Sequence, residues 1–356
     1  MPAKKRLPHV FFIDALRALA IFAVIILHNA ADYDEQLGEI PQNYWWAGTI
    51  WNGLVRFCVP MFVIISGALL LRAGTTVSIK EIFLKRLPRI LIPLVFWSIV
   101  YVLFDNYNSD KTFSEINVKE LVKTFYEGPV AYHLWFLYML IGIYLLYPVI
   151  NFFITVAEEI HVRYFLIVWF LVNCIIGILD IIFNVNIGIE LNFFTGYVGY
   201  FVLGYYLNTF LFTIQALRNA YLLGIAGFII SVLFPYLCIA LHIQVRHALI
   251  ESDFTPDIVF SAAGLFLWMK NKYAEVEKPT GTHKVINEIS KESLGIYLVH
   301  VLVMEIIFSE KRSYTENLES LHPAWLIPLK AVIILIISYA VIKLIRLVPY
   351  LRKVAG

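Results

Sequence analysis

Long apolar runs separated by short polar segments make up most of this chain. A helix that crosses a bilayer needs about 20 predominantly apolar residues, and the runs approach or exceed that length. They cover residues 10–30, 50–71, 88–105, 132–155, 163–183, 192–212, 220–241, 256–270, 292–308 and 324–345. We therefore predict an all-α polytopic membrane protein with about ten transmembrane helices, of which 256–270 is the shortest.

The composition agrees with this pattern. Of the 356 residues, 60% are hydrophobic and 15% are charged, a balance typical of integral membrane proteins. A net charge of +2 gives no reason to expect nucleic acid as a partner. Cys58, Cys174 and Cys238 are scattered in apolar runs, which favours neither a disulfide framework nor a zinc site. Without an internal repeat or a long polar tail, residues 1–356 are expected to form a single domain.

The distribution of Lys and Arg predicts an orientation. If the N-terminus is cytoplasmic, the inner segments hold 19 of the 28 basic residues and the outer segments hold six. Cytoplasmic segments carry the excess of Lys and Arg in membrane proteins, so both termini are expected on the cytoplasmic side. The basic start resembles a signal peptide, but Asp14 and Arg17 interrupt the apolar run that follows it. We therefore expect this first span to be retained.

The first span carries an acid, a base and a histidine: Asp14, Arg17 and His28. Ionisable groups inside a membrane cost about 2.5–3.5 kcal/mol each on insertion scales and usually mark a path for a proton, an ion or a substrate. Arg17 and His28 are eleven residues apart, close to three helical turns, so they share a face and lie about 16 Å apart along the axis. Asp14 precedes Arg17 by three residues and can pair with it.

A basic pair, Arg86 and Arg89, opens the third span. The two residues are three apart and share a helix face, and Pro88 suits a first helical turn. Free backbone N–H groups at a helix start, combined with two guanidinium groups, form a favourable phosphate site. The alternative is ordinary anchoring of the span by arginines that reach the cytoplasmic surface.

Further candidates lie in other spans. Arg56, in the second span, lies near the outer level of the histidine of the first span. His133 and Trp135 open the fourth span, where an aromatic belt is the alternative explanation. Tyr297 and His300 are three residues apart in the ninth span. Three histidines in separate spans, together with two membrane arginines, suggest a common cavity.

Other reaction classes find little support. The sequence shows no nucleophile elbow, no glycine-rich phosphate loop after a strand and no metal-ligand spacing, so no bound metal or cofactor is expected. A transporter or exporter of a lipid-linked glycan is the competing class, because it also uses intramembrane charges. Two features count against a transporter. No inverted repeat is evident, and the basic pair lies at one helix start, whereas transporters bind their substrates near the middle of the membrane.

Taken in order, these motifs resemble the membrane acyltransferase 3 family over most of the chain. The motifs are Asp14-x-Leu-Arg17 with an Arg-x10-His step to His28, Val59-Pro60-x-Phe62…Ser66-Gly67, Arg86-x-x-Arg89, His133-Leu-Trp135-Phe-Leu and Ser293…Tyr297-Leu-x-His300. The short chain resembles the minimal glycan O-acetyltransferase branch, which has no esterase domain of the SGNH type.

The resemblance implies a multi-pass enzyme of the bacterial cytoplasmic membrane, surrounded by lipid, that moves an acyl group from cytoplasmic acyl-CoA to a glycan hydroxyl. Acetyl-CoA is the expected co-substrate, with succinyl or another short acyl group as an alternative. The acceptor is a cell-envelope or secreted glycan, lipid-linked or free. The oligomeric state is not predicted.

The resemblance also assigns roles to residues. His28 becomes the essential histidine, acting as a general base or, alternatively, through an acyl-histidine intermediate, with Arg17 and Asp14 as its companions. Arg86 and Arg89 become candidates for the CoA phosphates. Candidates for contacts with the acceptor or the oxyanion are Arg56, His133, Trp135, Tyr297 and His300.

Overall fold

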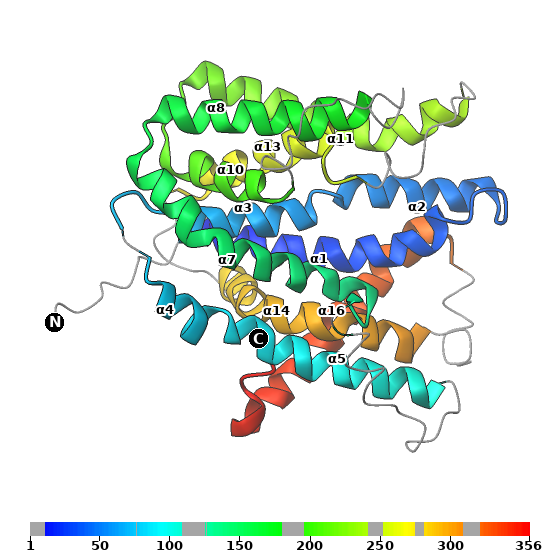
Figure 1. The fold of residues 1–356 in the computed structure, drawn as a ribbon. Coiled ribbons are helices and arrows are strands. Elements are labelled where there is room, and N and C mark those ends of the chain that lie inside the picture. The colour runs from blue at the N-terminus through cyan, green and yellow to red at the C-terminus, as the bar shows by residue number, and fades with distance from the viewer. Residues whose placement is uncertain are drawn as a thin grey trace.

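The computed structural model describes residues 11–75, 77–108, 125, 127–179, 196–240, 252–274, 281–308 and 321–356. Within these ranges every regular element is a helix. The longer helices lie side by side along a common direction (Figure 1). The helices are α1 Phe11–Asp34, α2 Gln42–Val55, α3 Cys58–Leu70, α4 Ile79–Glu81, η1 Ile82–Arg86, α5 Pro88–Asn108, η3 Tyr132–Leu134, α7 Trp135–Val156, α8 Glu159–Phe170, η4 Leu171–Ile176, α10 Val198–Thr209, α11 Ile214–Ala240, α13 Pro256–Lys272, α14 Gly281–Phe308, α16 Pro323–Leu347 and η7 Pro349–Leu351.

Seven helical segments in the described ranges are long and apolar enough to cross a membrane. They are 11–34, 42–70, 79–108, 132–156, 159–179, 214–238 and 323–347. The other three predicted spans correspond to α10 with 12 described residues, α13 with 17, and α14, whose first half is charged. The all-helical, multi-pass architecture is therefore confirmed, while the count of ten and the orientation stay predictions.

The second predicted span differs from a single helix. It begins earlier than expected, at Gln42, and consists of α2 and α3 with a break at Arg56 and Phe57. Pro60 explains the break, because it has no N–H to donate to the carbonyl four residues earlier and its ring clashes with that carbonyl. The segment between the third and fourth predicted spans falls largely on residues 109–124, which lie outside the described ranges.

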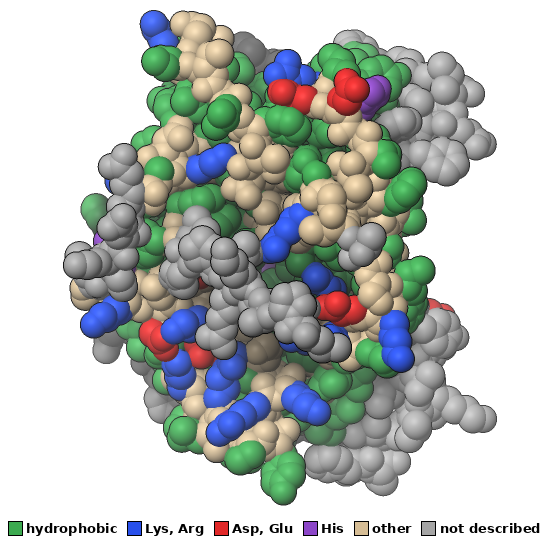
Figure 2. Space-filling view, turned by 90° about the vertical axis from the view of Figure 1, so that its left-hand side faces the viewer, with side chains coloured by type: hydrophobic (Ala, Val, Ile, Leu, Met, Phe, Trp, Pro, Cys, Tyr) green, Lys and Arg blue, Asp and Glu red, His purple; other side chains and the backbone are tan. Residues whose placement is uncertain are grey.

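One end of the bundle is strongly basic. α1 and α5 begin at this end and α16 finishes there (Figure 1). Lys and Arg side chains are spread over it in the view along the bundle (Figure 2). We call this the basic end; it is the end that the charge distribution predicts to be cytoplasmic.

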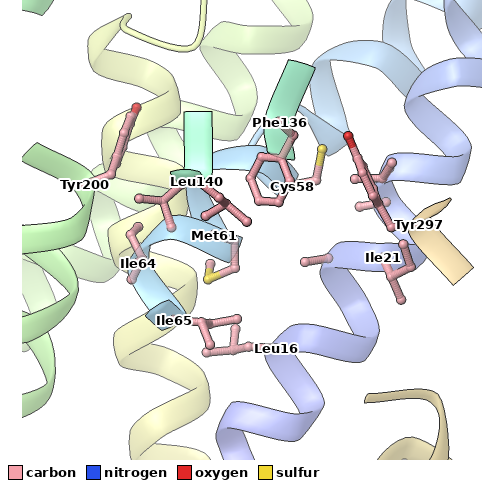
Figure 3. Close-up of a cluster of buried hydrophobic side chains, with 14 of the residues drawn as sticks. Leu16, Ile21, Cys58, Met61, Ile64, Ile65, Phe136, Leu140, Tyr200 and Tyr297 are labelled. Atoms are coloured by element: carbon pink, nitrogen blue, oxygen red, sulfur yellow. The ribbon is translucent and has the colours of Figure 1, made fainter. Parts of the chain in front are cut away.

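The first helix lies at the centre of the bundle. α1 contacts α2, α3, α13, α14 and α16, and its Leu16 and Ile21 side chains are fully buried. Figure 3 shows Leu16 pointing toward Ile65 of α3, whereas Ile21 lies on the side of α1 toward Tyr297. Because protein interiors are close-packed, this apolar contact fixes the rotation of α1 and with it the direction of its polar face.

α3 and α10 approach each other through glycines. A methyl group on Gly67 would overlap the backbone carbonyl of Phe201, and one on Gly204 would overlap the carbonyl of Ile64. Small residues allow such close approach of membrane helices. The two helices are therefore locked in one register.

Gly67→Ala is expected to destabilise the folded protein by about 1–3 kcal/mol, the usual cost of overpacking an interior. The methyl group has no space because it meets backbone atoms, which cannot rotate away. Thermal unfolding of the purified protein in detergent measures the effect. Gly142→Ala on α7 is the matched control, since a methyl group there meets nothing within 4 Å. Equal melting temperatures for the two variants would contradict the locked register.

Candidate active site

A polar cluster joins α1 to α14 in the half of α1 nearer the basic end. The Ser290 hydroxyl donates a hydrogen bond to Asp14 Oδ1 at 2.5 Å, and Arg17 Nη1 donates to Ser290 Oγ at 3.4 Å. Arg17 Nη1 also lies 3.9 Å from Asp14 Oδ1. The pairing expected from the three-residue spacing is therefore present, and Ser290 completes it. Sequence reasoning did not assign Ser290 to this pair, because only packing brings α14 beside α1.

Three histidines from different helices meet toward the other end of α1. The rings of His28 and His300 are stacked, with centroids 5.2 Å apart, and the rings of His133 and His300 lie 5.3 Å apart. Tyr297 contacts His133 at 5.6 Å. We call these four residues the histidine cluster. The three predicted histidines are therefore in contact with one another, but only His28 of the three lines a cavity.

Hydrogen bonds hold the buried members of the histidine cluster. His300 Nδ1 lies 2.6 Å from the Tyr297 carbonyl oxygen, and because a carbonyl only accepts, Nδ1 carries the proton and Nε2 is unprotonated in the neutral ring. The Tyr297 hydroxyl donates to the backbone carbonyl of His133. His133 and His300 are 1% and 0% exposed. Both are therefore positioned behind His28, which is half-buried.

His28 and Tyr132 border a cavity that opens away from the basic end. It has a volume of about 550 Å³, and Asp32, Glu35 and Glu305 also line it. The ring of Tyr132 contacts that of His28, with centroids 5.1 Å apart. Sequence reasoning missed Tyr132, although it directly precedes His133. Within the histidine cluster, His28 is thus the member that lines this cavity.

Two sequence candidates lie apart from the histidine cluster. Arg56 Nε donates to Asn52 Oδ1 at 2.9 Å, and Asn52 Nδ2 donates to Asp34 Oδ2 at 2.8 Å. Arg56 also lines a separate, mainly apolar cavity beside α11 and α13. Trp135 contacts Phe136 and Tyr197. Arg56 is therefore held in a hydrogen-bond network with Asn52, and Trp135 packs among aromatic rings outside the histidine cluster.

A second cavity lies at the basic end, with a volume of about 890 Å³. Its lining includes Lys85, Arg86 and Arg89 from η1 and α5, together with Arg352 and Lys353. We call it the basic cavity. Arg86 lies over the ring of Tyr147, 5.0 Å from its centroid. The predicted basic pair therefore lines a cavity, with Arg86 half-buried and Arg89 exposed.

Tyr144 connects the basic cavity to the polar face of α1. It lines the cavity and interacts electrostatically with Arg17 as well as with Arg86 and Arg89. Arginines from α1, η1 and α5 therefore all interact with this one tyrosine. The polar cluster of Asp14, Arg17 and Ser290 therefore lies next to the basic cavity.

A family model described as an acyltransferase domain, that of the acyltransferase 3 family, matches residues 10–343. This chain belongs to the acyltransferase 3 family. The match extends from the start of α1 almost to the end of α16 and includes every candidate residue predicted from the sequence. No curated protein and no solved structure matches the chain significantly. Family membership makes the protein a membrane acyltransferase, so the two cavities can be interpreted as sites for its donor and acceptor.

Proposed function

We propose that this acyltransferase moves an acetyl or other short acyl group from cytoplasmic acyl-CoA to a hydroxyl of a cell-envelope glycan, in a bacterial cytoplasmic membrane. One observation carries the proposal: a basic cavity and a cavity-lining histidine lie toward opposite ends of a single buried helix, α1. A donor that is highly anionic at one end and reactive at the other fits this arrangement.

The donor binds from the basic end. The phosphates of CoA occupy the basic cavity, where Arg86 and Arg89 form charge-assisted hydrogen bonds with them. The pantetheine arm then extends past Tyr144 along the polar face of α1. Arg17 is held by Asp14 and Ser290. Its guanidinium group keeps this route polar and contacts the pantetheine.

The acceptor hydroxyl reaches His28 from the cavity at the opposite end. His28 removes the hydroxyl proton, as a neutral imidazole can near neutral pH. The hydroxyl oxygen attacks the thioester carbonyl carbon, a C–O bond forms, and the C–S bond breaks as the tetrahedral intermediate collapses. The imidazolium of His28 returns its proton to the departing CoA thiolate. The products are the O-acyl glycan and free CoA.

The neighbours of His28 position the ring and stabilise charge. His300 stacks on His28, which restricts the orientation of its imidazole. The oxyanion of the intermediate needs a hydrogen-bond donor. Tyr132 is the stronger candidate for that role, because it lines the cavity beside His28, whereas the Tyr297 hydroxyl is bonded to the His133 carbonyl.

Release of free CoA tests the proposal. The purified protein in proteoliposomes, given acetyl-CoA and envelope glycans extracted from a strain lacking the gene, is expected to release CoA only when both substrates are present. Mass spectrometry of the recovered glycan should show the added acetyl group. Heat-inactivated protein is the control. Movement of glycan across the bilayer without CoA release would instead assign the protein to the transporters.

A further inference from the structure

The segment that follows α16 folds back against the bundle. The indole N–H of Trp97 on α5 donates to the Val354 carbonyl at 2.9 Å. Val354 is 7% exposed and Ala355 is fully buried. Arg346 Nη2 donates to the Gly356 carbonyl at 2.7 Å. Residues 348–356, which we call the C-terminal arm, are therefore attached to the fold by specific contacts.

The surface of α14 is shaped to receive this arm. A methyl group on Gly295 would overlap the Ala355 carbonyl oxygen, so the backbones of the arm and α14 touch directly. Arg352 Nε donates to the Arg346 carbonyl at 3.1 Å. That bond holds the guanidinium group through Nε, and Arg352 also lines the basic cavity. The side chain is thus anchored before any ligand binds.

The arm forms one wall of the basic cavity. Arg352 and Lys353 line it from the C-terminal arm, while Arg86 at the end of η1 and Arg89 at the start of α5 line it as well. Arg86 and Arg89 are the residues nearer the interior, because both interact electrostatically with Tyr144, as Arg17 of α1 does. The cavity is therefore lined by two basic pairs, and Arg86 and Arg89 form the pair next to the polar face of α1.

Acyl-CoA carries its negative charge in two places. The diphosphate joins the pantetheine arm to the nucleoside, and a separate phosphate is attached to the ribose 3′ oxygen. If the thioester extends inward, as the proposed function requires, the diphosphate lies by Arg86 and Arg89. The 3′-phosphate is then left on the other side of the cavity. A phosphomonoester dianion is a strong ligand for guanidinium and ammonium groups.

We propose that Arg352 and Lys353 bind the ribose 3′-phosphate of the acyl-CoA donor. The inference rests on the proposed function and adds a specificity to it: the enzyme distinguishes acyl-CoA from its 3′-dephospho analogue. These two residues lie beyond the part of the chain that the family model matches, residues 10–343. The discrimination is therefore carried by the C-terminal arm, outside the residues that the family model matches.

The test measures KM for acetyl-CoA and for acetyl-3′-dephospho-CoA. In the wild-type protein, KM should be about 10- to 100-fold higher for the dephospho donor, the loss expected for hydrogen bonds to a charged group. In R352Q/K353Q, KM for acetyl-CoA should rise to the dephospho value, while KM for the dephospho donor and kcat stay within about twofold. Unchanged kinetics with the dephospho donor also show that the variant is folded.

Lys80→Gln is the matched control, because Lys80 is an exposed residue on α4 near the same end and does not line the cavity. It should leave both KM values unchanged. An equal rise for both donors in R352Q/K353Q would mean that the arm attracts anions in general, and this would overturn the inference. So would competition between anionic phospholipid and acetyl-CoA that disappears in the double variant, because the arm would then bind lipid phosphate.

The two proposals fail differently. Wild-type transfer from both donors with equal KM contradicts the 3′-phosphate assignment and leaves the proposed function intact. Absence of transfer from either donor contradicts the proposed function, and the 3′-phosphate assignment with it.

Discussion

Replacing His28 by alanine is expected to lower kcat by about 100- to 10,000-fold, the range that general acid–base catalysis contributes. His28 is the member of the histidine cluster that lines the cavity opposite the basic end. His133 and His300 are buried behind it and cannot take over the acceptor proton. CoA release with saturating acetyl-CoA and glycan measures the loss, and the amount and melting temperature of the protein should stay normal.

His161→Ala is the control for the histidine substitution, because His161 is exposed near the start of α8, away from both cavities. It should retain wild-type turnover. Transfer that survives in His28→Ala would remove His28 from the mechanism. Label from acetyl-CoA that stays on wild-type protein without acceptor, and is absent in His28→Ala, would instead support an acyl-histidine intermediate.

The second large effect is expected from Arg86→Gln combined with Arg89→Gln. Both side chains line the basic cavity, and each hydrogen bond to a charged phosphate contributes about 1.5–3 kcal/mol. Loss of two such contacts should raise KM for acetyl-CoA by about 100-fold or more. kcat at saturating donor should change little, because neither residue touches the reacting atoms. KM should rise for the 3′-dephospho donor as well, in contrast to R352Q/K353Q.

Lys80→Gln again serves as the control for the removal of a basic side chain. If KM for acetyl-CoA is the same in the Arg86 and Arg89 double variant as in the wild type, the pair only anchors α5 at the membrane surface. The basic cavity would then need another occupant.

The sequence by itself determined the class of fold and the composition of the helix faces. Apolar runs of membrane length become helices because a backbone in lipid must satisfy its hydrogen bonds within the segment. Helical periodicity alone placed Arg17 and His28 on one face and Arg86 beside Arg89. The break between α2 and α3 was less visible in hydropathy, since Pro60 lies within the apolar stretch that begins at Phe57.

Only the tertiary structure decided which polar faces meet. Residues distant in sequence, such as His28 and His300 or Asp14 and Ser290, come together because close packing around α1 sets the rotation of each neighbouring helix. The same packing brought Lys353 to the cavity that Arg89 lines. Periodicity describes the face of one helix, whereas partners depend on contacts between helices that no local pattern encodes.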